Sequence, residues 1–152
     1  MKYLIIAVVL ALQVVSAAAE IVPPKEVQVL LKPILDLRAK AESSQGEQQQ
    51  SAFVQSDKLI GNLFRKKSRA ADEALVVLMN FYVGESLQTD LVHQVTTRGK
   101  RMLPLLLKYE HAPVALPGVN YPKSLLVADD VRKKGFDDAI EAVKTGKVVG
   151  ED

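Results

Sequence analysis

The sequence RAADEALVVLMNFYV, residues 69–83, decides the fold class. As a helix, it would carry apolar side chains on every face: Ala71, Leu75, Leu78 and Tyr82 on one, and Val76, Val77, Met79, Phe81 and Val83 on the others. A helix that is apolar all round is normally buried on most of its sides. Ser68 can cap its start, and Gly84 can end it. We therefore predict a central helix over residues 69–83.

The next apolar pattern predicts a second long helix beside the first. Leu91, Val95, Met102, Leu106 and Tyr109 fall within about 60° of one another on a helix that advances 100° per residue. This phase continues through Gly99 and Pro104, which favours one bent helix over residues 87–109. We place the bend near residues 100–104, because proline lacks an amide donor. The short connection at 84–86 then makes the two helices an antiparallel αα-hairpin.

Shorter helical patterns and two loops flank this hairpin. Apolar residues at helical spacing predict helices over residues 27–35, 59–64 and 136–143, the last preceded by a short turn from 129 that stops at Gly135. Residues 42–51 are rich in glutamine and serine and predict a flexible polar loop. Residues 111–124 contain three prolines and predict an extended surface loop. The fold class is therefore all-α: a small single-domain bundle of about five helices, residues 20–152.

The first 19 residues have the pattern of a secretory signal peptide. Lys2 supplies the positive charge, residues 3–15 are apolar apart from Gln13, and Ala17 and Ala19 match the small residues that precede a cleavage site. The apolar run is shorter than the roughly 20 residues of a transmembrane helix. We expect cleavage before Glu20, export to the periplasm or the medium, and no integral membrane segment in the mature chain.

Composition and motifs exclude many common catalytic sites. The chain has no cysteine, which rules out thiol catalysis, cysteinyl zinc sites and a disulfide framework. The glycine-rich nucleotide loops, the nucleophile elbow and the His-Glu-x-x-His motif do not occur. Asp90 and His93 share a helix face but supply only two ligands, so we expect no metal site and no cofactor. The net charge is +2, or +1 without the leader, and aromatics for base stacking are few, which argues against nucleic acid as a partner.

Three polar residues are the candidates for ligand or anion binding: Arg98, Asn80 and Arg101. Arg98 lies in the apolar stripe of the second helix, where a charge needs a partner. That partner is an internal acid such as Asp72 or Glu85, a bound anion, or water at the edge of the stripe. Asn80 is the one polar position between residues 75 and 83. If buried, its amide must bond to a neighbouring element or to a ligand.

Basic residues form three clusters, each near an expected helix end. They are Arg65-Lys66-Lys67 with Arg69, Arg98 with Lys100-Arg101, and Arg132-Lys133-Lys134. Cations at the end of a helix offset its dipole, which explains these clusters without a function. If the first two converge in the folded chain, they form a basic patch suited to anionic lipid, a wall polymer or an acidic protein.

Three functions follow from these observations. The first is an exported, non-catalytic helical protein that acts as a protein-interaction or envelope-associated module, holding a protein of the cell envelope on the hairpin or the proline-rich loop. The second is a small-ligand or anion-binding protein with a pocket near Arg98 and Asn80. A concave pocket with convergent polar groups favours this second function. The third is a carboxylate-based hydrolase, although the acidic pairs 72–73, 129–130 and 137–138 are adjacent in sequence and diverge by about 100° on a helix.

Overall fold

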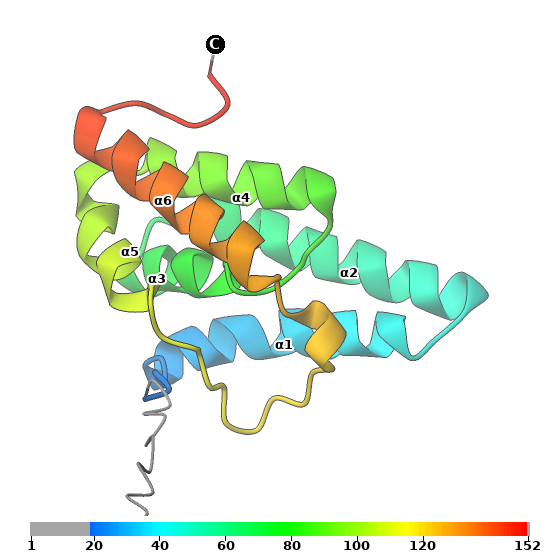
Figure 1. The fold of residues 1–152 in the computed structure, drawn as a ribbon. Helices are drawn as coiled ribbons and strands as arrows, with labels where there is room; N and C mark the ends of the chain where they lie inside the picture. The colour runs from blue at the N-terminus through cyan, green and yellow to red at the C-terminus, as the bar shows by residue number, and fades with distance from the viewer. Residues whose placement is uncertain (1–18, 152) are drawn as a thin grey trace, which may run out of the picture.

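The computed structural model describes residues 19–151, so the expected leader lies almost wholly outside the described residues. Within them the chain forms α-helices, two short 3-10 helices and no sheet, which confirms the all-α prediction (Figure 1). The elements are α1 (Lys25–Glu42), α2 (Gly46–Arg65), α3 (Arg69–Leu78), α4 (Glu85–Thr97), η1 (Gly99–Met102), α5 (Leu103–Tyr109), η2 (Lys123–Leu125) and α6 (Asp129–Thr145). No helix in residues 19–151 is both long enough and apolar enough to cross a bilayer.

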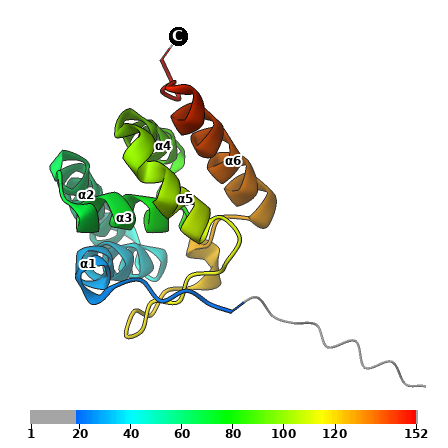
Figure 2. The ribbon, with the colours of Figure 1, turned by 90° about the vertical axis from the view of Figure 1, so that its left-hand side faces the viewer.

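The helix α3 lies at the centre of the bundle. It contacts α1 and α2 as well as α4 and α5, and α6 packs on α4 and α5. Figure 2 shows α3 between the α1–α2 pair and the group of α4, α5 and α6. Every residue from Ala71 to Leu78 is buried, as expected for a helix that is apolar on all faces. The buried apolar side chains form one cluster to which all six α-helices contribute.

The most closely packed helix pair is α1 with α2, which the sequence did not single out. The two run antiparallel and are joined by residues 43–45 (Figure 1). Arg38 of α1 is buried, forms an ion pair with Asp57 of α2, and places its guanidinium 5.2 Å from the centre of the Phe53 ring. Burial lowers the pKa of Arg38, and the charge of Asp57 opposes that effect.

The prediction of a flexible loop over residues 42–51 is wrong, because α2 begins at Gly46. Ala52, Ile60 and Leu63 bury the apolar stripe of α2, and the polar residues before them continue the same helix at its start. The Gln49 amide donates to the carbonyl oxygen of Ala41 at 3.1 Å, which satisfies a carbonyl near the end of α1. The polar composition of residues 46–51 therefore indicates exposed side chains on a helix and not a loop.

The central helix ends at Leu78, five residues before its predicted end. The next residues turn away to pair with residues 125–127: the Tyr82 amide donates to the Leu125 carbonyl at 2.6 Å, and the Val127 amide donates to the Asn80 carbonyl at 3.1 Å. Phe81 and Val83 are buried while Tyr82 is 47% exposed. This alternation is that of an extended chain, so apolar side chains continue beyond the helix.

The second predicted helix, residues 87–109, is two helices with a 3-10 turn between them. α4 ends at Thr97, and Gly99 has a φ of +76°, which interrupts the right-handed helix before Pro104 is reached. Pro104 instead lies in the first turn of α5. The predicted stop at Gly135 is also wrong: α6 runs through it and ends at Thr145, followed by Gly146, whose φ is +72°.

The proline-rich loop crosses the surface without helix over residues 111–122 and returns to the bundle through η2. Its first part is paired with the start of the described chain. The Ile21 amide donates to the Pro113 carbonyl at 2.9 Å, and the Ala115 amide donates to the Ile21 carbonyl at 3.0 Å. The loop is therefore a fixed part of the fold.

Candidate functional site

Asp72, in the first turn of α3, is held by two arginines. Arg98 donates from Nη1 to Oδ1 of Asp72 at 2.5 Å, and Arg101 donates from Nε to Oδ2 at 2.9 Å. Arg98 also donates from Nη2 to the Phe64 carbonyl at 2.9 Å, near the end of α2. The side chains of Arg98 and Asp72 are only 7% and 10% exposed. Of the partners foreseen for Arg98, the structure shows the internal acid Asp72.

This arrangement does not build the ligand pocket expected near Arg98 and Asn80. Arg98 is neutralised by Asp72 at the start of α3, whereas Asn80 follows the last residue of that helix. The two candidates therefore lie at opposite ends of α3. Arg101 shares Asp72 with Arg98 but is 54% exposed, so it extends from the buried pair to the surface.

Glu73 is buried beside Asp72 and has partners of its own. Its Oε1 accepts hydrogen bonds from the Lys108 ammonium and the Tyr109 hydroxyl, both at 2.6 Å. Burial, together with the hydrogen bond and the charge of Glu73, raises the pKa of Tyr109. Both carboxylates of this adjacent pair thus join α3 to the segment from Arg98 to Tyr109.

The first two basic clusters meet around Asp72, which is the convergence that the sequence left open. Lys67, Arg69 and Arg101 line one hollow together with Pro104 and Leu105. We define the basic face by its exposed cations: Arg65, Lys66, Lys67, Arg69, Lys100, Arg101 and Lys108. α3 and α5, which carry part of this face, are turned toward the viewer in Figure 2.

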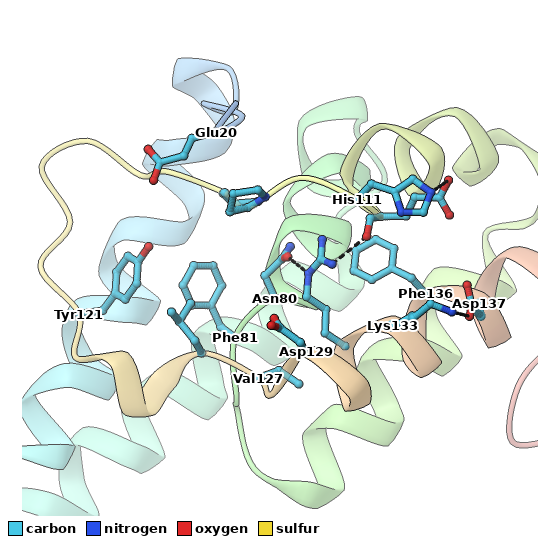
Figure 3. Close-up of a pocket in the computed structure, with 15 residues that line it drawn as sticks. Glu20, Asn80, Phe81, His111, Tyr121, Val127, Asp129, Lys133, Phe136 and Asp137 are labelled. Carbon is cyan, nitrogen blue, oxygen red and sulfur yellow. Dashed lines mark hydrogen bonds and ion pairs between the residues drawn. The ribbon is translucent and has the colours of Figure 1, made fainter. Parts of the chain in front are cut away.

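A second site is a cleft of about 620 Å³ between the proline-rich loop and α6 (Figure 3). We call it the Arg132 cleft. Its walls come from five parts of the chain: Glu20, the turn after α3, residues 110–121, residues 126–127 and the first turns of α6. The side chains used below are Glu20, Asn80, Phe81, Glu110, His111, Tyr121, Leu126, Asp129, Arg132, Lys133, Phe136 and Asp137.

Arg132 fixes the walls of this cleft to one another. Its Nε donates to Oδ1 of Asn80 at 2.6 Å, its Nη1 to the Glu110 carbonyl at 2.7 Å, and its Nη2 to the carbonyls of Tyr109 and Ala112, the latter at 3.3 Å. The guanidinium also lies 4.9 Å from the centre of the Phe136 ring. Burial lowers the pKa of Arg132, and the nearby carboxylates of Asp129 and Glu110 oppose that effect.

All three nitrogens of Arg132 donate to the protein itself, in four hydrogen bonds, so its guanidinium is not arranged as an anion site. The Asn80 amide nitrogen donates to the Val77 carbonyl at 2.9 Å, and its oxygen accepts from Arg132 of α6, which is the structural bond to a neighbouring element that the sequence allowed. The sequence missed Arg132, which it placed in a cluster at a helix end. Its i, i+4 spacing to Phe136 was the one available signal.

The other side chains of the cleft differ in how accessible they are. The Phe81 and Tyr121 rings meet edge to face with centres 5.0 Å apart, but Phe81 is buried, so the half-buried Tyr121 is the ring that the cleft can present. Burial raises the pKa of Tyr121, and the charge of Glu20 adds to the effect. Lys133 is paired with Asp137 at 3.1 Å. Within residues 19–151, no ion pair involves Glu20 or Asp129.

In the part of the chain that the structure describes, no three His, Asp or Glu side chains are grouped to hold a metal. His93, the histidine considered with Asp90, instead has its Nδ1 2.9 Å from the Val149 carbonyl oxygen. It therefore contacts the segment after α6.

The chain matches no protein-family model, and no similar protein was found among curated proteins or solved structures. The geometry of the Arg132 cleft and of the basic face is what bears on function.

Proposed function

We propose that the protein is an exported, non-catalytic binding module that holds a segment of a partner protein in the Arg132 cleft. One observation carries the proposal: hydrogen bonds fix the frame of the cleft, while the half-buried Tyr121, the 44% exposed Leu126 and the exposed carboxylates of Glu20 and Asp129 line it. Export is supported by the signal-peptide pattern of residues 1–19.

The cleft is formed before any partner arrives. The loop that makes its upper wall in Figure 3 is tied to Ile21 by two backbone hydrogen bonds and to Arg132 through carbonyl oxygens. A partner therefore does not have to order this loop, which lowers the entropic cost of binding.

A partner segment suits this cleft better than a small polar ligand. The donors that converge in it, from Arg132 and Asn80, bond to the protein rather than pointing into free space. Leu126 lines the cleft and is 44% exposed. We expect the partner to place an apolar side chain against Tyr121 and Leu126, because burying such surface is the main driving force of association.

The non-catalytic part of the proposal is supported by the acids that a hydrolase would need. Asp72 bonds to two arginines, and Glu73 bonds to Lys108 and Tyr109. Neither is presented to a substrate. Asp129 and Asp130 stand in the first turn of α6, where acidic side chains stabilise the positive end of the helix.

Affinity capture of the chain beginning at Glu20 from its own cell envelope tests the proposal. Leu126→Glu puts a charge on the apolar wall of the cleft, and Val54→Glu makes the same change at a 60% exposed valine of α2. We expect a partner recovered by the wild type to be kept by Val54→Glu and lost by Leu126→Glu. A partner that Leu126→Glu retains is bound elsewhere and would overturn the proposal.

A further inference from the structure

The basic face contains more cations than its carboxylates can pair. Its seven members are all exposed, and within residues 19–151 only Arg101 and Lys108 lie within ion-pair distance of an acid, namely Asp72 and Glu73. The five without a carboxylate partner in this part of the chain are Arg65, Lys66, Lys67, Arg69 and Lys100. This surface is therefore strongly positive.

The charge is also concentrated. The seven exposed cations and the buried Arg98, set against Asp72 and Glu73, leave +6 at this junction, whereas the whole chain carries +2, so the rest of the chain sums to −4. The charge of this nearly neutral chain is thus unevenly distributed, with an excess of positive charge at the junction of α2, α3, η1 and α5. Such an uneven field orients a protein against an anionic surface.

Buried hydrogen bonds join the segments that carry the basic face. Arg98 bonds both to Asp72 of α3 and to the Phe64 carbonyl of α2, and Arg101 bonds to the same carboxylate. The three segments that carry most of the cations are therefore fixed relative to one another. They present their charges together rather than as independent flexible ends.

Apolar side chains lie among these cations. Pro104 and Leu105 share the hollow with Lys67, Arg69 and Arg101. Leu107, which is 46% exposed, lies three residues after Pro104 and therefore on the same side of α5. An acidic protein surface or a soluble polyanion would match the charges alone. A lipid surface offers anionic headgroups with acyl chains beneath them, so it matches both the cations and the leucines.

We infer that the basic face docks on the anionic headgroups of a lipid bilayer, with Leu107 reaching toward the acyl region. The protein would then lie on the membrane surface. This inference does not depend on the Arg132 cleft, which belongs to a different part of the fold.

Vesicle co-sedimentation tests the inference, with the chain beginning at Glu20. This form omits the apolar leader, which would itself bind lipid, and it keeps every buried core residue, since the first of them is Val27. We expect binding to vesicles of 30% phosphatidylglycerol in phosphatidylcholine, little binding to phosphatidylcholine alone, and loss of binding as salt rises.

The variants compare equal changes in net charge on and off the face. One basic residue near an anionic surface is worth roughly a fivefold change in partition, so the triple change Lys66→Gln, Lys67→Gln, Arg69→Gln should weaken binding about 100-fold. The control is Lys40→Gln, Lys123→Gln, Lys134→Gln, three exposed lysines outside the face. It should weaken binding far less, because only the general attraction of the net charge is lost.

Leu107→Gln separates a bilayer from a soluble acidic partner. We expect it to weaken vesicle binding and to leave binding of polyglutamate unchanged. Equal binding to neutral and anionic vesicles, or equal losses in the two triple variants, would refute the inference. Binding of polyglutamate without binding of anionic vesicles would assign the face to an acidic protein and exclude the bilayer.

Discussion

Replacing Asp72 by asparagine isolates the charge that holds the N-terminal end of α3. The substitution keeps the size of the side chain and removes its negative charge. Arg98 then remains 7% exposed with its positive charge and no carboxylate. A guanidinium cannot escape by losing a proton, because its intrinsic pKa is too high.

The expected cost follows from what Arg98 retains. Removing one partner of a buried ion pair destabilises a protein by about 3–5 kcal/mol, because the other charge is left uncompensated. Arg98 keeps its hydrogen bond to the Phe64 carbonyl, and the second partner, Arg101, is 54% exposed and regains water. We therefore expect the lower end of this range, about 3 kcal/mol.

Two further substitutions in the same ion-pair cluster give smaller expected losses of stability, against which Asp72→Asn can be compared. Arg98→Met leaves the Asp72 carboxylate with Arg101, so we expect a smaller loss of about 1–2 kcal/mol. Arg101→Gln removes a mostly exposed partner and should cost less than about 1 kcal/mol.

Urea unfolding of the three variants measures these costs from the midpoint, with the slope held constant as a check on two-state behaviour. The predicted order of destabilisation is Asp72→Asn, then Arg98→Met, then Arg101→Gln. An Asp72→Asn variant that loses no more stability than Arg101→Gln would show that Asp72 is solvated, and the argument for a buried ion pair would fail.

Three other predictions concern single side chains. Tyr109→Phe should lose about 1–2 kcal/mol of unfolding free energy at pH 7, because it removes the hydrogen bond to Glu73. The pKa of Tyr109 is raised above its ordinary 10, so the stability that the tyrosine adds is present below pH 10 and falls above it. The urea midpoints of wild type and variant should therefore converge above pH 10, and a constant difference between them would contradict this. Gly99→Ala should cost about 1–2 kcal/mol because of the φ of +76° alone, since nothing lies within 4 Å of the added carbon. Gly61→Ala, within α2, should instead stabilise by about 0.5–1 kcal/mol. Thermal or urea unfolding in which both variants change stability in the same direction would refute the backbone argument. Arg132→Lys should cost about 1–3 kcal/mol, because an ammonium cannot reproduce the several donors of a guanidinium. It should also speed hydrogen exchange of the Ala115 amide. Unchanged exchange would show that Arg132 does not hold the proline-rich loop in place.

The features that the sequence predicted well depend on local spacing. Ser68 caps α3 by accepting a hydrogen bond from the Ala71 amide at 3.1 Å, as its position before the apolar run indicated. The helical phase of Arg98 correctly placed a charge that needs an acid, and Asp72 was one of the two acids named. The cap required only neighbouring residues, and the placement of Arg98 required only the phase of its own helix together with the rule that buried charges are paired.

The features that the sequence missed depend on contacts between distant segments. The run from Leu78 to Val83 is apolar in a helix and in an extended chain alike, and only pairing with residues 125–127 selects the extended form. Residues 46–51 look like a loop because their polarity reports exposure, while the helix they begin is set by the packing of α2 on α1. Arg132 satisfies carbonyl groups 20–23 residues before it, a relation that spacing on α6 does not contain.

The hydrogen bonds of Arg132 also determine how a partner can enter the cleft. The proline-rich loop is fastened to α6 through the Glu110 and Ala112 carbonyls and to the N-terminal segment through Ile21, so it cannot swing aside unless these bonds break. It therefore acts as a fixed wall and not as a lid. Association should then be a single bimolecular step without a preceding gating motion, and differences in affinity between partners should appear mainly in how fast they leave.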